Sequence, residues 1–130
     1  MSGRRLALGI GCERDAASPA LQALVTATLA DHGINAADID VIASLDTKTG
    51  EEALRALGTA LNLPLRFFSA TALLAETKRL ANPSDAVFRA VGCYGVAEGA
   101  ALAAAGAQSK LIVPKQNGNG VTCAIAGNPS

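Results

Sequence analysis

The sequence predicts an α/β fold, with one three-layer α/β/α domain that contains a mixed β-sheet and a C-terminal β-hairpin and spans residues 1–130. Two observations predict this fold class. Short apolar runs alternate along the chain with amphipathic or alanine-rich stretches, an order typical of a sheet with helices on its faces. The Asn-Gly-Asn-Gly sequence at residues 117–120 separates the last two apolar runs and is a strong signal for a hairpin turn.

We expect strands at residues 5–11, 39–45, 65–68, 110–115 and 121–126, and helices at residues 19–32, 51–61, 71–80, 85–91 and 96–105. The first run is continuously apolar rather than alternating, which favours a buried strand inside the sheet, with the hairpin towards an edge. Ser18, Ser69 and Ser84 precede helical stretches. We expect them to cap these helices, because a serine hydroxyl accepts a hydrogen bond from a free N–H at a helix start.

The composition excludes several classes of function. The 11 Lys and Arg residues balance the 11 Asp and Glu residues and only 3% of residues are aromatic, so we expect no nucleic-acid partner. No run of about 20 apolar residues is present in the sequence, so we expect no membrane span. Cys12, Cys93 and Cys123 lack metal-ligand spacing, which predicts free thiols in a reducing cytoplasm, without a metal or another cofactor.

Polar side chains gather where the predicted parallel strands end. Ligands of open α/β sheets bind beyond the carboxyl ends of the strands. The candidate residues there are Gly11, Cys12 and Arg14 after the first strand, Asp46, Thr47 and Lys48 after the second, and Ser69 after the third. A dinucleotide-binding fingerprint, Gly-x-Gly-x-x-Gly, starts at Gly9 but has Arg14 in place of its third glycine, so nucleotide binding is disfavoured.

Four candidate residues have two interpretations each. Cys12 is either a nucleophile whose pKa is lowered by Arg14 or a small buried residue in a tight turn. Asp46 is either a catalytic or ligand-orienting carboxylate or a turn former. Glu98, the one acid in an alanine-rich helix, is either functional or at a solvated helix edge, and Lys115 is either a ligand-binding cation or a solvated lysine.

The most specific motif in the chain is Val-Gly-Cys-Tyr-Gly-Val-Ala-Glu-Gly-Ala-Ala at residues 91–101. It occurs together with Gly-Ile-Gly-Cys at 9–12, Ser-Leu-Asp-Thr-Lys at 44–48, Phe-Phe-Ser at 67–69, Leu-Ile-Val-Pro-Lys at 111–115 and Val-Thr-Cys-Ala-Ile-Ala at 121–126. In order and spacing these motifs resemble the CobE family, the stand-alone relatives of the C-terminal domain of CbiG from cobalamin (vitamin B12) biosynthesis. The resemblance covers essentially the whole chain.

This resemblance implies a protein that acts on or binds a precorrin or corrinoid intermediate in the oxygen-dependent pathway, to which the stand-alone proteins belong. Full-length CbiG-like proteins open a lactone on a cobalt-precorrin and release acetaldehyde, which implies a hydrolase or lyase-type step. The intermediates carry many carboxylates around an apolar macrocycle, so a receptor needs a few cations on an apolar cleft. The expected ligand-binding residues are Gly11, Arg14, Thr47, Lys48, Ser69 and Lys115.

Two classes of function remain open, a catalyst and a non-catalytic carrier or accessory protein that holds a labile intermediate between pathway enzymes. For a catalyst we expect Asp46 or Glu98 to transfer the proton, ahead of Cys12, because desolvation at the rim of an apolar cleft raises the pKa of a carboxylate. Cys12 lacks a base, since His32, the one histidine, is expected at the opposite edge of the sheet.

Overall fold

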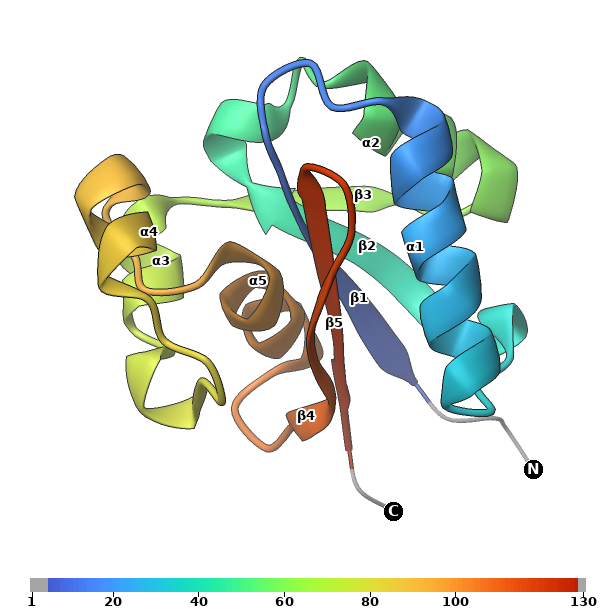
Figure 1. Cartoon of the computed structure of the whole chain (residues 1–130). Coiled ribbons are helices and arrows are strands. Elements are labelled where there is room, and N and C mark those ends of the chain that lie inside the picture. Colours follow the sequence, from blue (N-terminus) through green and yellow to red (C-terminus); the bar gives the residue numbers. More distant parts are fainter. Residues whose placement is uncertain (1–4, 129–130) are drawn as a thin grey trace.

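The computed structural model describes residues 5–128, and this part of the chain forms a five-stranded mixed sheet (Figure 1). Its strands are β1 (Leu6–Cys12), β2 (Ile39–Leu45), β3 (Leu65–Phe68), β4 (Lys110–Asn117) and β5 (Val121–Gly127). They lie in the order β3-β2-β1-β5-β4, with β1, β2 and β3 parallel and β5 antiparallel to both β1 and β4. The predicted first strand inside the sheet and the hairpin towards an edge are both confirmed.

Helices cover both faces of the sheet, which confirms the predicted α/β fold class (Figure 1). One face carries α1 (Ser18–Asp31) and α2 (Glu52–Leu61), and the other carries α3 (Ala70–Leu74), α4 (Asp85–Val91) and α5 (Val96–Ala105). Within residues 5–128, no single helix has the length and apolar character needed to cross a membrane. The helices α4 and α5 satisfy that criterion only as a pair, bent by 79°.

The side chains of β1 alternate between the two helical layers, as the period of two along a strand requires. Leu6, Leu8 and Ile10 are buried in a core cluster with residues of α1 and α2. Gly9 and Gly11 face the opposite layer, where Gly9 contacts α5 and Gly11 lies between α5 and the side chain of Thr122 from β5. Because both faces of β1 are covered, a continuously apolar sequence fits this strand.

The helix α5 lies directly against β1 because Gly9 has no side chain. A Cβ atom added to Gly9 would overlap the carbonyl oxygen of Ala97 and lie 2.6 Å from the backbone nitrogen of Ala101. The two neighbours are backbone atoms of a buried helix, so they cannot rotate away as a flexible side chain would. The missing side chain at Gly9 and the small alanine side chains of α5 together permit this close approach of helix and sheet.

The C-terminal end of α5 is held by Arg79, from the 3-10 turn Thr77–Arg79. Its guanidinium donates to the carbonyl oxygens of Gly106 at 3.2 Å and Ser109 at 2.7 Å, and it pairs with Glu76 at 2.6 Å. A cation at this end of a helix complements the partial negative charge of the free carbonyl groups. Both the side and the end of α5 are thus fixed.

The predicted helix at residues 71–80 is wrong, because the chain forms two short segments there, α3 and the turn Thr77–Arg79. The hydroxyl of Thr77 donates to the carbonyl oxygen of Leu74, and this local hydrogen bond competes with continuation of the helix. The predicted cap at Ser18 is also displaced, since Ser18 is the first residue of α1 and Ala17 occupies the N-cap position.

The other two predicted caps are confirmed. The hydroxyl oxygen of Ser69 accepts a hydrogen bond from the backbone N–H of Ala72 at 3.1 Å, and that of Ser84 accepts one from Val87 at 3.2 Å. These bonds satisfy backbone donors at the starts of α3 and α4 that have no partner within the helix.

Substitution of Gly9 by alanine should destabilise the protein, because the new methyl group would push α5 away from the sheet. We expect a loss of about 2–4 kcal/mol in the free energy of unfolding, measured by urea denaturation. Gly50→Ala is the matched control, since a Cβ atom there meets nothing within 4 Å. Equal denaturation midpoints for the two variants would contradict the close contact at Gly9.

Candidate functional site

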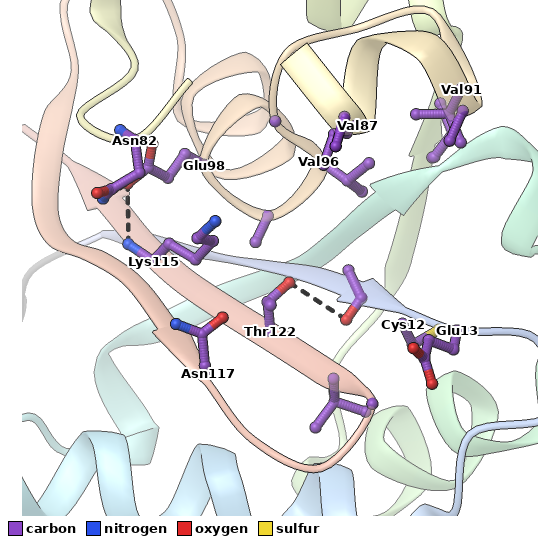
Figure 2. A pocket seen from close by; sticks show the side chains of 18 of the residues that line it. Cys12, Glu13, Asn82, Val87, Val91, Val96, Glu98, Lys115, Asn117 and Thr122 are labelled. Atoms are coloured by element: carbon purple, nitrogen blue, oxygen red, sulfur yellow. Dashed lines mark hydrogen bonds between the residues drawn. The ribbon is translucent and has the colours of Figure 1, made fainter. Parts of the chain in front are cut away.

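A cleft of about 550 Å³ lies at the carboxyl ends of β1 and β2, between α4, the start of α5 and the β4–β5 hairpin (Figure 2). Its charged and polar lining residues are Glu13, Lys48, Asn82, Glu98, Lys115, Asn117 and Thr122. Much of the remaining lining is aliphatic, with Val87 and Val91 from α4, Val96 from α5 and Leu45 from β2. The cleft therefore combines a few polar groups with an apolar wall.

Five of the nine predicted site residues line this cleft, namely Gly11, Cys12, Lys48, Glu98 and Lys115. The other four are Arg14, Asp46, Thr47 and Ser69, which are exposed and lie outside its lining. Asp46 and Thr47 begin a 3-10 turn of which only the last residue, Lys48, reaches the cleft. The hydroxyl oxygen of Ser69 is occupied in capping α3.

Lys48, from the 3-10 turn after β2, and Lys115, from β4, bring two cations to the cleft. Both side chains are half-buried. Among the described residues, the ion pairs are Arg55–Glu52 and Arg79–Glu76, so neither lysine has a carboxylate partner within 4 Å. Two ammonium groups that form no ion pair with the described residues can pair with the carboxylates of a ligand in this cleft.

Glu98 is a buried carboxylate rather than a residue at a solvated helix edge. It is 2% exposed and accepts hydrogen bonds from the backbone N–H groups of Ala81, Asn82 and Lys115 at 3.0, 2.9 and 2.8 Å. The side-chain amide of Asn82 donates a fourth, at 2.9 Å. Burial acts to raise the pKa of Glu98, but the four hydrogen bonds outweigh it and the pKa lies below its ordinary value. The predicted rise in its pKa is therefore wrong.

The thiol of Cys12 is half-buried at the end of β1. Burial raises its pKa, and the positive charge of Lys48 opposes that rise only in part, while Glu51 adds to it. Of the two interpretations of Cys12, the nucleophile with a lowered pKa is therefore wrong, and the cation that acts on the thiol is Lys48 rather than Arg14. A raised pKa keeps Cys12 in the neutral, weakly nucleophilic form near pH 7.

Sequence reasoning missed several lining residues because it treated them as chain breaks and turns. Asn82 precedes a proline, a pattern typical of a chain break, although its backbone N–H and side-chain amide both donate hydrogen bonds to Glu98. Tyr94 also lines the cleft, and its ring stacks on that of Phe88 with centroids 4.6 Å apart. Tyr94 is the one tyrosine of the chain and lies between Gly92 and Gly95, and this was the sequence signal that could have indicated a site residue.

The hairpin tip at Gly120 was likewise predicted only as a turn. Gly120 has a φ of 76°, which glycine adopts without strain, and its carbonyl oxygen accepts a hydrogen bond from the N–H of Glu13 at 2.9 Å. This bond joins the hairpin tip to the loop after β1, so both border the cleft. Within residues 5–128, no group of three or more His, Cys, Asp or Glu residues could hold a metal ion.

Together, the mixed sheet and the lysine-bearing cleft at its strand ends define an α/β domain with a candidate site at the carboxyl ends of its parallel strands. Residues 6–126 match the model of the family described as cobalamin synthesis G C-terminus. The chain belongs to this family and is a cobalamin biosynthesis protein. It is 44% identical to Protein CobE of Sinorhizobium sp. over 126 residues, which cover 97% of this chain and 82% of that protein.

A second curated relative is larger. Cobalt-precorrin-5A hydrolase of Priestia megaterium is 30% identical over 121 residues, which cover 93% of this chain but only 32% of the hydrolase. The resemblance of this chain to the family, stated from its motifs, is therefore confirmed for both the stand-alone and the longer relatives.

Solved structures agree with this assignment. The crystal structure of CobE, a protein from the cobalamin biosynthetic pathway, has a TM-score of 0.88 and 38% identity, covering 95% of this chain and 89% of that chain. Cobalamin biosynthesis protein chiG from Agrobacterium tumefaciens str. C58 has a TM-score of 0.72 and 34% identity, covering 96% and 99%. A cobalamin biosynthesis protein G homolog from Sulfolobus solfataricus has a TM-score of 0.71 and 25% identity, covering 95% and 36%.

Replacement of Glu98 by glutamine should lower the free energy of unfolding at pH 7 by about 2–4 kcal/mol. The four N–H donors around Glu98 bind two carboxylate oxygens, whereas the neutral amide of glutamine offers them only one acceptor oxygen. The pKa of Glu98 is lowered on folding, so its stabilisation is complete above the unfolded value of about 4.3 and is lost as the pH falls through the folded pKa. The difference between wild type and Glu98→Gln should therefore shrink on acidification.

Urea denaturation of both proteins from pH 7 to pH 3 measures this difference. Glu52→Gln is the matched control, because Glu52 is exposed and its ion pair with Arg55 is also exposed, so the effect of this substitution should be small. A Glu98→Gln effect that is no larger than the Glu52→Gln effect at pH 7 would contradict the structure.

Proposed function

We propose that the cleft binds an anionic tetrapyrrole intermediate of cobalamin biosynthesis, with Lys48 and Lys115 as the partners of its carboxylates. The observation that supports this most strongly is the pair of half-buried lysines on an apolar-walled cleft, neither of which forms an ion pair with a carboxylate in residues 5–128. Membership of a cobalamin biosynthesis family supplies the ligand class. Following the resemblance to stand-alone CobE-like proteins, we assign the intermediate to the oxygen-dependent pathway in the cytoplasm.

The chemistry of the cleft suits the two parts of such a molecule. A precorrin or corrinoid has an apolar ring and a periphery of acetate and propionate carboxylates. In the proposed complex, the ring lies against the aliphatic wall of Val87, Val91 and Val96, and the carboxylates reach the two lysines. The first turn of α5 also borders the cleft, and its free N–H groups favour negative charge.

We further propose that the protein holds the intermediate for other enzymes of the pathway rather than transforming it. The properties of the three candidate catalytic residues support this. Glu98 has a lowered pKa and four hydrogen bonds, Asp46 lies outside the cleft lining, and burial raises the pKa of Cys12. None of these is the arrangement expected of an acid, base or nucleophile working near pH 7.

A catalytic role is the second candidate, and one relative favours it. The hydrolase of Priestia megaterium shares 30% identity with this chain, although the chain spans about a third of that enzyme. A carrier returns the tetrapyrrole unchanged, whereas a hydrolase alters its mass and absorption spectrum. Mass spectrometry of a pathway intermediate after incubation with the protein distinguishes the two, and a changed mass would remove the carrier role.

Lys48→Ala and Lys115→Ala should each weaken binding of a polycarboxylate tetrapyrrole by roughly tenfold to a hundredfold, the value of a desolvated charge-assisted pair. Isothermal titration calorimetry with uroporphyrin, a ring that bears acetate and propionate side chains, measures this. Lys110→Ala is the matched control, because Lys110 is an exposed lysine of the same strand as Lys115 and lies outside the cleft lining.

The control should bind as the wild type does. Equal affinities for wild type, Lys48→Ala and Lys115→Ala would remove the proposed carboxylate partners. Failure of the wild type to bind uroporphyrin and pathway intermediates alike would remove the proposed function.

A further inference from the structure

The strand β4 departs from regular pairing with β5 at the place where Lys115 lies. Val113 pairs with Ile125 and Gln116 pairs with Cys123, so β4 contains one more residue than β5 between these two pairs. This is a bulge, and bulges next to binding sites turn a side chain towards a new direction. Pro114, the other residue of this segment, has no N–H to donate.

The bulge leaves the N–H of Lys115 outside the β4–β5 ladder, and Glu98 binds it. One carboxylate oxygen of Glu98 accepts from Lys115 at 2.8 Å and from the side-chain amide of Asn82 at 2.9 Å. The other oxygen accepts from the backbone N–H groups of Ala81 and Asn82. One buried side chain of α5 thus connects two segments, the bulge of β4 and the loop before α4.

Both connected segments contribute to the cleft. Figure 2 shows Asn82, Glu98 and Lys115 together on one side of it, opposite Cys12 and Glu13. Lys115 is one of the two lysines proposed to bind the ligand. The carboxylate of Glu98 accepts four hydrogen bonds, so its oxygens are already occupied and these donors offset part of its negative charge.

We propose that Glu98 is a positioning residue, which holds the bulge of β4 so that Lys115 presents its ammonium group to the cleft. This inference rests on the proposed function, because it assigns Lys115 to a ligand carboxylate. It differs from a purely structural role of Glu98, which would lower stability without acting through Lys115 in particular.

A double-mutant cycle separates the two roles. Uroporphyrin affinity is measured for wild type, Glu98→Gln, Lys115→Ala and the double variant, at a temperature where circular dichroism shows all four to be folded. Glu98→Gln should weaken binding about tenfold in the presence of Lys115 and by less than about twofold in the Lys115→Ala background. Equal losses in the two backgrounds would overturn the proposal.

A second destabilised variant, with a substitution outside the cleft, shows whether lower stability alone weakens binding. Ser44→Ala removes a buried hydrogen bond of 2.7 Å to the carbonyl oxygen of Ile10, and Ser44 does not line the cleft. This variant should bind uroporphyrin as the wild type does. Weakening by Ser44→Ala as large as that by Glu98→Gln would also overturn the proposal.

Amide hydrogen exchange provides a test without any ligand. In Glu98→Gln the N–H of Lys115 should lose at least tenfold more protection than the N–H groups of β5, whose exchange reports the general loss of stability. If wild type fails to bind uroporphyrin, the proposed function is in doubt, but this measurement still decides whether Glu98 holds Lys115. Unchanged exchange at Lys115 would overturn the positioning role whatever the binding result.

Discussion

The contact between α5 and β1 at Gly9 determines where the rest of the site lies. Because a single added carbon at Gly9 would overlap the backbone of α5, the helix and the strand have essentially one distance of approach. Arg79 holds the far end of the helix through the carbonyl oxygens around Gly106. Because the side and the C-terminal end of α5 are fixed, its first turn lies at the carboxyl ends of β1 and β2. Glu98 belongs to this turn and therefore lies at the cleft.

The mixed sheet explains why two unrelated parts of the chain meet at this cleft. The parallel strands β1 and β2 end there and supply Gly11, Cys12 and Lys48, as expected for an open α/β sheet. The antiparallel β5 begins opposite Cys12, where Cys12 pairs with Val121, so the turn of the hairpin lies at the same edge. The hairpin thereby adds Lys115 and Gly120 to the lining of the cleft.

Local patterns were sufficient for much of the fold. The continuously apolar first run and the Asn-Gly turn predicted the central strand and the edge hairpin, and the strand-end rule found Lys48 and Cys12. The burial of Glu98 could not be predicted, because its donors come from residues 81–82 and 115, distant in sequence, and a glutamate is rarely buried without such partners. The bulge of β4 depends on its pairing with β5, and Pro114 was its only trace in the sequence.

The central claim is that the cleft at these strand ends is the site for an anionic tetrapyrrole. Amide NMR spectra recorded during titration with uroporphyrin test it most directly. The account predicts saturable shifts of the signals of Gly11, Gly95 and Gly120, which line the cleft, and unchanged signals for Gly33 and Gly106, which follow the C-terminal ends of α1 and α5. Shifts confined to Gly33 and Gly106, or no saturable shifts at the three cleft glycines, would contradict it.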